Sequence, residues 1–200
     1  METTVYAFEG VVPVIDPLAY VHPSAVLIGD VIVGAGCYVG PGAVLRGDFG
    51  RIVMQPNANL QDNCIVHSAP DFECVIEEEA HVGHGAVIHC ARIGRDSLVG
   101  INAVIMDTAV VGEQAVVAAM SFVKVADVVP PRVLVAGVPA RVRRALSDDD
   151  IAWKRRGTSF YIELAQRARD GGIVATKPLE RVEEERARVN WDFVSVRPRG

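Results

Sequence analysis

A six-residue periodicity runs through more than half of the chain. A branched or long aliphatic residue recurs at every sixth position, and a small residue follows most of these four positions later. The aliphatic positions are Val21, Leu27, Val33, Val39 and Leu45, then Met54, Leu60 and Val66, then Ile76, Val82 and Ile88, and after a slip of one residue Ile93, Val99, Ile105, Val111, Val117 and Val123. Neither the helical period of about 3.6 residues nor simple strand alternation produces this pattern.

Such a period predicts an all-β solenoid, a parallel β-helix. Each six-residue unit forms one short strand and one corner, and three units complete a coil of about 18 residues. The aliphatic residues would fill the interior, where stacked coils bury a continuous apolar column. The small residues would fit the corners, and they are Ala25, Cys37, Ala43, Ala58, Cys64, Ala80, Ala86, Ser97, Ala103, Ala109, Ala115 and Ser121. We expect six glycines to serve turns that need a permissive backbone: Gly34, Gly40, Gly83, Gly94, Gly100 and Gly112.

Two steps are longer than six residues. The step from Leu45 to Met54 is nine, which predicts three extruded residues near "DFGRI". The step from Val66 to Ile76 is ten, which predicts four extruded residues around "SAPDFEC". Loops on a rigid scaffold often carry function, so both insertions are candidate parts of a site.

The periodicity also predicts the domain organisation. We expect a lead-in over residues 1–20, the β-helix over 21–128, a connector over 129–146, a C-terminal α-helix over 147–170 and a tail over 171–200. Pro130 and Pro131 argue against a regular continuation of the solenoid. Ser147 can cap the helix, and Gly171 and Gly172 can end it.

Composition limits the class of ligand. Half of the residues are hydrophobic, the formal net charge is −5, and the charges are interspersed, so we expect neither nucleic-acid nor membrane binding. The chain has no basic segment followed by an apolar run at its start and no long apolar run later, which predicts a cytoplasmic protein. The four cysteines form no C-x-x-C pair and are expected to be reduced thiols. We therefore expect a small-molecule substrate.

Three histidines stand out against this background. His67 and His89 both follow an aliphatic position, and their separation of 22 residues equals one 18-residue coil plus the four-residue insertion. They should be stacked neighbours about 4.8 Å apart, close enough for both imidazoles to bind one metal ion at about 2.0–2.1 Å. His84 occupies another position of its unit, so it projects from a different face and does not reach the same ion within one chain.

A cyclic homotrimer would bring His84 of one subunit to the histidine pair of its neighbour. Three imidazoles and an open fourth position are typical of a catalytic zinc site. The alternative, a surface or hydrogen-bonded interface role, stays open for each histidine. For His22 and His81 we favour that alternative.

The segments "LRGDFG", "ANLQDNCIVH" and "GHGAVIHC", in this order on a hexapeptide period, resemble the γ-class carbonic anhydrase superfamily. The resemblance extends over the whole chain, and it implies a left-handed coil. It also implies that His67, His84 and His89 are the metal ligands, with His84 contributed across the trimer interface. Zinc is the default ion, and iron or cobalt would also accept imidazole ligands.

The resemblance further implies roles for six polar or aromatic residues. Arg46 and Asp48 match an interfacial ion pair near the metal. Asn59 and Gln61 match polar residues beside it, where the Gln61 amide would hold a water or substrate oxygen. Asp62 either orients a ligand or the arginine, or forms a turn with Asn63. Tyr161 is a candidate pocket residue whose alternative role is packing of the helix on the solenoid.

The implied function is a metal-dependent enzyme in which zinc-bound hydroxide attacks a small carbonyl electrophile. Acyl-CoA thioester hydrolysis, as in phenylacetate catabolism, and CO2 hydration both fit. The long acidic loop of efficient γ-class enzymes is absent, which counts against fast CO2 hydration. Two alternatives remain open: a hexapeptide-repeat acyl-CoA-dependent acyltransferase, which needs only one catalytic histidine, and a non-catalytic accessory protein of a CoA-ester pathway.

Overall fold

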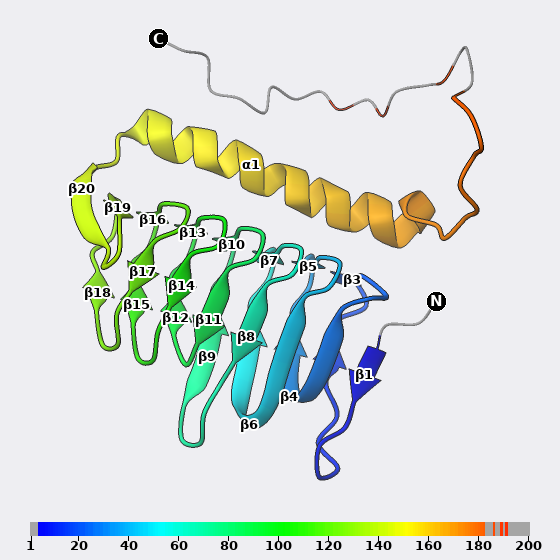
Figure 1. The fold of residues 1–200 in the computed structure, drawn as a ribbon, viewed down its shortest axis with the longest axis horizontal. Helices are drawn as coiled ribbons and strands as arrows, with labels where there is room; N and C mark the ends of the chain where they lie inside the picture. The colour runs from blue at the N-terminus through cyan, green and yellow to red at the C-terminus, as the bar shows by residue number, and fades with distance from the viewer. Residues whose placement is uncertain (1–3, 183–185, 187–188, 190, 192–200) are drawn as a thin grey trace.

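The chain forms a parallel β-solenoid of about seven turns followed by a single long helix (Figure 1), as seen in a computed structural model that describes residues 4–182, 186, 189 and 191. This confirms the predicted all-β solenoid with a C-terminal helix. The left-handed sense of the coil stays a prediction. Among the described residues, no helix has the uninterrupted apolar length that crossing a membrane requires.

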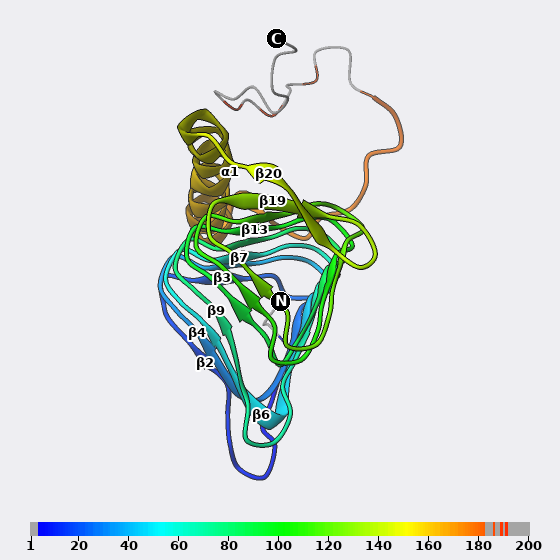
Figure 2. The same cartoon turned by 90° about the vertical axis from the view of Figure 1, so that its left-hand side faces the viewer.

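The strands stack on three faces of a three-sided tube (Figure 2). Face one contains β1 (Thr4–Tyr6), the first parts of β4 (Val26–Val33) and β6 (Val44–Met54), β8 (Ile65–His67), β11 (Val87–His89), β14 (Val104–Ile105) and β17 (Phe122–Val123). Face two contains β2 (Val14–Ile15), the second parts of β4 and β6, β9 (Glu73–Ile76), β12 (Arg92–Ile93), β15 (Val110–Val111) and β18 (Val128–Val129). Face three contains β3 (Tyr20–Val21), β5 (Tyr38–Val39), β7 (Asn59–Leu60), β10 (His81–Val82), β13 (Leu98–Val99), β16 (Val116–Val117), β19 (Val133–Ala136) and, antiparallel at its end, β20 (Arg141–Ala145).

The interior of the tube is the predicted apolar column. Every aliphatic residue of the six-residue period is buried, and so is every small residue that was expected at a corner. All four cysteines are buried and have free thiols. The periodic residues therefore form most of the core, which Val31, Ile52, Cys74 and Ala91 extend, and the outward-facing side chains remain available to form a site.

The six periodic glycines have a different role from the expected one. None of them has a positive φ; the left-handed corner positions are held instead by residues such as Asn57, Asn63 and Asn102, with φ of 60°, 58° and 54°. A Cβ added at Gly94 would lie 2.5 Å from the Val111 carbonyl oxygen of the next coil. These glycines are needed because the backbones of successive coils approach too closely for a side chain.

The solenoid extends beyond both expected boundaries. β1 and β2 lie in the expected lead-in and already pair with β4. At the other end, β19 lies in the expected connector and pairs in parallel with β16. Pro130 and Pro131 stand next to the corner between β18 and β19, where the absence of an N–H donor does not interrupt a strand.

The two insertions lie at one edge of the tube. The first is not a separate loop: residues 48–51 belong to the continuous strand β6 and stand opposite the single residue Asp30 of β4, which gives the three extra residues. The second insertion forms the loop between β8 and β9 (Figure 1). Both insertions therefore adjoin the end of β8, where His67 is located.

The helix α1 (Asp148–Arg167) begins with a capping box between Ser147 and Asp150. It continues into a short π-helical segment, η1 (Ala168–Gly172), and the chain turns at Gly171, which has a φ of 94°. α1 runs back along face three toward the N-terminal end of the solenoid (Figures 1 and 2). Of the predicted tail, residues 183–185, 187, 188, 190 and 192–200 lie outside the described residues.

A buried ion pair attaches α1 to the solenoid. Lys154 Nζ donates to Asp96 Oδ1 at 2.8 Å and to the Glu79 carbonyl at 2.9 Å, and Arg155 Nε donates to Asp96 Oδ2 at 2.7 Å. The side chains of Lys154 and Asp96 are only 4% and 3% exposed. Burial alone would raise the pKa of Asp96, but the hydrogen bond and charge of Lys154 outweigh it and lower that pKa.

We expect Asp96→Ala to lower the free energy of unfolding by about 3–5 kcal/mol, because it leaves the buried Lys154 ammonium without a counter-charge. Lys154→Met should be less destabilising, since Asp96 keeps Arg155 as its partner. Urea unfolding followed by circular dichroism measures both variants. Equal losses for the two would contradict this assignment of the ion pair.

Candidate functional site

His67 and His89 form an imidazole pair on face one. β8 and β11 are hydrogen-bonded neighbours with His67 opposite His89, as the spacing of 22 residues predicts. His67 Nδ1 lies 3.1 Å from His89 Nε2, and the ring centroids are 5.1 Å apart. Two nitrogens bound to one tetrahedral ion at about 2.0–2.1 Å lie about 3.3 Å apart. The pair therefore has the spacing of two ligands of one ion.

Two residues of β6, Asp48 and Phe49, contact the His67 ring. Asp48 Oδ1 lies 3.3 Å from His67 Nε2, and Arg46 Nη1 donates to both oxygens of Asp48 at 3.0 and 2.8 Å. The Phe49 ring covers the His67 ring at a centroid distance of 5.6 Å. Burial and the Arg46 charge lower the pKa of His67, so the ring is neutral and able to offer a lone pair at neutral pH. The expected pairing of Arg46 with Asp48 is thus present within one chain.

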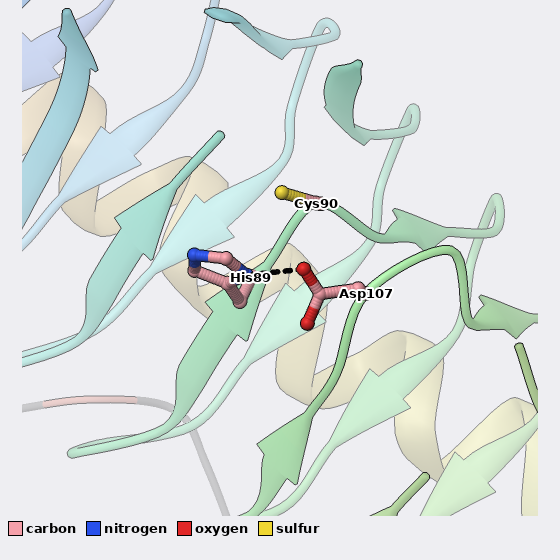
Figure 3. Close-up of side chains that lie close together, drawn as sticks. All are labelled: His89, Cys90 and Asp107. Carbon is pink, nitrogen blue, oxygen red and sulfur yellow. Dashed lines mark hydrogen bonds and ion pairs between the residues drawn. The ribbon is translucent and has the colours of Figure 1, made fainter. Parts of the chain in front are cut away.

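Asp107 holds His89 in the same way, and the sequence analysis missed it. It follows β14, and its Oδ1 accepts a hydrogen bond from His89 Nδ1 at 2.9 Å (Figure 3). A carboxylate at Nδ1 fixes the proton there and leaves the Nε2 lone pair free toward His67. A usable signal existed: Asp107 lies 18 residues after His89, which is one coil.

Cys90 lies beside this pair. The candidate ligand atoms of His89, Cys90 and Asp107 are all within 4.8 Å of one another (Figure 3). Burial raises the pKa of the Cys90 thiol, which keeps it protonated and a poor metal ligand. We therefore assign Asp107 as a support of His89 and do not count Cys90 as a ligand.

His84 lies apart from the pair. It occupies the corner that precedes β11, whereas His89 is the last residue of β11. Its Nδ1 lies 3.2 Å from Asp62 Oδ2, and both side chains are about two-fifths exposed, at 43% and 42%. Asp62 precedes Asn63 in the corner one coil earlier, so it both belongs to a turn and contacts His84.

Asn59, Gln61 and His81 lie on face three beneath α1, and Tyr161 reaches them from α1. The Gln61 Nε2 amide donates to Asn59 Oδ1 at 3.2 Å and to His81 Nε2 at 2.6 Å. The Tyr161 ring stands perpendicular to the His81 ring at 5.1 Å. Within one chain these residues adjoin His84, with which Gln61 and Tyr161 line one groove, and not the pair on face one.

His81 has a larger role than its expected surface or interface position. Burial, followed by the charge of Lys154, lowers its pKa to about 3, so the ring is neutral and its Nε2 accepts the Gln61 hydrogen bond. Both N–H groups of Gln61 are then used, which leaves Gln61 Oε1 as a free acceptor. The sequence analysis expected the Gln61 amide to hold a water or a substrate oxygen. In this arrangement Gln61 Oε1 can accept a hydrogen bond from a donor such as water. The sequence spacing of 22 residues, which places His81 opposite Asn59 in the next coil, could have predicted this contact.

Comparisons with known proteins bear on this fold and site. A family model described as "Bacterial transferase hexapeptide (six repeats)" matches residues 13–47. The chain is 51% identical over 197 residues to the carnitine operon protein CaiE of Proteus sp. (strain LE138), covering 98% of this chain and 99% of that protein. It is 54% identical to CaiE of Escherichia coli (strain K12) over 184 residues, 92% and 93% of the two chains. The chain belongs to the CaiE family of hexapeptide-repeat proteins.

Solved structures support the same fold for this CaiE-family chain. The BC4754 gene product of Bacillus cereus, named as an acetyltransferase, superposes with a TM-score of 0.83 at 30% identity over 85% of this chain and 99% of that one. A hexapeptide transferase family protein from Anaplasma phagocytophilum gives a TM-score of 0.79 at 31% identity over 83% and 98%.

The His81 environment generates a pH prediction. The unfolded chain binds a proton at His81 near pH 6.5, whereas the folded chain does so only near pH 3, so the free energy of unfolding should fall as the pH drops below 6.5. The contribution approaches about 1.4 kcal/mol per pH unit. His81→Asn should flatten this dependence between pH 6.5 and about 5.5, above the range where most carboxylates titrate. Urea unfolding at several pH values checks it; parallel curves for the two proteins would refute the assignment.

Proposed function

We propose that this CaiE-family protein is a zinc-dependent hydrolase that works as a homotrimer, with His67 and His89 of one subunit and His84 of the next as the metal ligands. One observation carries the proposal: each of the three histidines has a carboxylate at one ring nitrogen, from Asp48, Asp107 and Asp62 respectively. Metal-binding histidines almost always donate their other ring N–H to a carboxylate, a backbone carbonyl or a water, which orients the ring and raises its basicity. The other nitrogen of each ring is then available to an ion, and the donor set suits zinc.

The outer surface of face one supports the trimer. Its outward-facing side chains form an apolar column in register from coil to coil, consisting of Val26, Val44, Ile65, Val87, Val104 and Phe122. The helix α1 covers face three and leaves this column uncovered, and Ile65 is 47% exposed. In a cyclic arrangement the corner that carries His84 would pack on this column. A second copy of the chain would thus bury the column and complete the ligand set.

Zn2+, when bound, supplies a Lewis acid that activates water at neutral pH. The chain's own residues then have distinct tasks. Asp48, Asp107 and Asp62 keep a proton on the far nitrogen of each histidine. Gln61, held by Asn59 and His81, offers Oε1 as an acceptor that orients a water donor beside His84.

A thioester is the substrate we favour, as in the CoA-ester role of the phenylacetate-degradation protein PaaY, which the sequence also resembles. A groove of about 450 Å³ begins at Gln61 and His84 and continues along Leu98, Val116 and Leu134. CO2 needs no such groove, whereas an acyl-CoA has an extended, partly apolar chain to place. CO2 hydration remains the second reaction of the same centre.

An acyltransferase is the second candidate function, favoured by the transferase description of the matching family model and by the name of the Bacillus cereus neighbour. It predicts transfer of an acetyl group from CoA to an amine or hydroxyl acceptor without bound metal. A non-catalytic accessory protein predicts bound metal and no turnover.

The deciding experiment uses one zinc-loaded preparation with known metal content and oligomer mass. Acyl-CoA hydrolysis is followed by release of free thiol, CO2 hydration by stopped flow, and acyl transfer by mass spectrometry of the acceptor. We expect thiol release that a chelator abolishes and added zinc restores. Acyl transfer that is indifferent to chelator would overturn the proposal in favour of the acyltransferase.

His84→Ala should abolish stoichiometric zinc binding and leave a folded protein, because the solenoid is stabilised by its aliphatic column. Elemental analysis and circular dichroism measure the two outcomes. His22→Ala is the matched control, since His22 hydrogen-bonds to Ser24 and meets the Tyr20 ring near the N-terminal end of the solenoid, and this variant should retain its zinc. One zinc per subunit in the His84→Ala protein would rule out the assigned ligand set.

Asp107→Asn should weaken zinc binding about 10- to 100-fold, because an amide no longer fixes the His89 proton as firmly as a carboxylate. Competition with a chelator of known affinity measures this loss without an activity assay. Thr108→Ala alters the neighbouring exposed side chain and serves as the control. An unchanged zinc affinity in Asp107→Asn would remove Asp107 from the site.

A further inference from the structure

Three buried polar atoms beneath α1 have no hydrogen-bond partner among the described residues. They are Asn59 Nδ2, His81 Nδ1 and Thr158 Oγ1. The residues Asn59 and Thr158 are only 1% and 2% exposed. A fourth such atom, Ser97 Oγ, belongs to a small corner residue of the solenoid core. Because an unpaired buried donor or acceptor is costly, native structures almost always supply a partner from the protein or from ordered water.

The first three atoms belong to one layer between face three and α1. Asn59 and His81 stand opposite each other on the neighbouring strands β7 and β10. On α1, Lys154 hydrogen-bonds to the corner just before β10, and Tyr161 packs on the His81 ring. Thr158 lies four residues after Lys154 and three before Tyr161, so it shares their side of the helix. Contacts between α1 and β7 complete this layer (Figure 1).

A water molecule has room here. A cavity of about 210 Å³ lies between α1 and face three, and His81, Lys154, Gly157 and Tyr161 are among its lining residues. His81 carries one of the unpaired atoms, and the other three residues surround Thr158 on α1. A single water needs only about 10–15 Å³ of such space. The chemistry of the three atoms, and not the volume, therefore decides what binds to them.

This chemistry selects water. Asn59 Nδ2 can only donate, and His81 Nδ1 carries the ring proton because His81 Nε2 accepts from Gln61. The Thr158 hydroxyl can donate or accept. One water oxygen can accept from both nitrogens while the same water donates to Thr158 Oγ1, which gives the three hydrogen bonds typical of a buried water. A cation does not fit, since two N–H groups would face it.

We propose that Asn59, His81 and Thr158 bind one buried water, and that through it Thr158 is a positioning residue for Gln61. The water accepts the Nδ1 proton of His81 and so stabilises the tautomer with a free Nε2 lone pair. That lone pair accepts from Gln61 Nε2 at 2.6 Å, which leaves Gln61 Oε1 for the groove beside His84. The effect on turnover rests on the proposed function, whereas the water and the tautomer do not.

Nitrogen-15 NMR of the whole protein tests the tautomer directly, because the shift of each imidazole nitrogen reports whether it carries a proton. The chain has five histidines, and His81→Asn identifies the His81 signals by their loss. We expect the wild-type proton on Nδ1, and one ordered water at the three atoms in a crystal structure. Thr158→Val should raise the ratio of the Nε2-protonated to the Nδ1-protonated form about five- to tenfold, the effect of one hydrogen bond. Thr158→Ser should retain the wild-type ratio.

Ser159→Ala is the matched control, since it removes an exposed hydroxyl of α1 that bonds only to the Arg155 carbonyl among the described residues. Thermal unfolding should show that Thr158→Val remains folded, and the two wild-type readings need no variant. A wild-type proton on Nε2, a halide or no density at the three atoms, or an unchanged ratio in Thr158→Val would each overturn the buried water.

In the zinc-loaded protein, Thr158→Val should lower kcat for acyl-CoA hydrolysis several-fold at unchanged zinc content. An unchanged kcat together with a shifted tautomer would overturn the positioning role of Thr158. A wild-type protein with the Nδ1 tautomer and the ordered water but without hydrolysis would instead overturn the proposed function and leave the water site in place.

Discussion

The hydrogen-bond ladder between successive coils is the interaction on which the rest of this structure depends. Apart from the antiparallel β20 and the strands at the two ends, each strand pairs in parallel with the strand one coil earlier and one coil later, and the aliphatic column fills the space inside. The ladder fixes which side chains are neighbours on the outer surface, because a residue contacts the one that stands a full coil away. His67 and His89 meet for this reason, and Asn59 meets His81 by the same rule.

The three candidate ligand histidines share one electrostatic design. Each has an acidic partner from the coil before or after it, and the position of that partner differs among them. Asp48 is itself neutralised by Arg46, so the side of the pair at His67 carries less net negative charge than the side at Asp107. The contact between Arg46 Nη1 and both oxygens of Asp48 fixes geometry more than it adds stability, because Arg46 remains partly exposed to water.

The core and the histidine pair could be predicted from sequence because both follow from counting residues around a coil. The residues that contact these histidines were harder to predict, because they depend on the identity of single side chains and not on the period. Asp107 follows the same count, but a single aspartate after a strand is common and carries no motif. The role of His81 depends on burial under α1, which no period in the solenoid reports. The glycines were misassigned because a turn and a close approach of two backbones favour the same residue.

A cavity beneath α1 is lined by the solenoid on one side and by α1 on the other. His81 and Leu98 belong to the solenoid, whereas Trp153, Gly157 and Phe160 belong to one surface helix that the ion pair with Asp96 holds in place. Related proteins can therefore differ in the helix residues that line the cavity, while the coils that position the imidazoles stay the same. In a lineage of such proteins, the shape of this cavity could therefore change through substitutions confined to about two turns of a single helix.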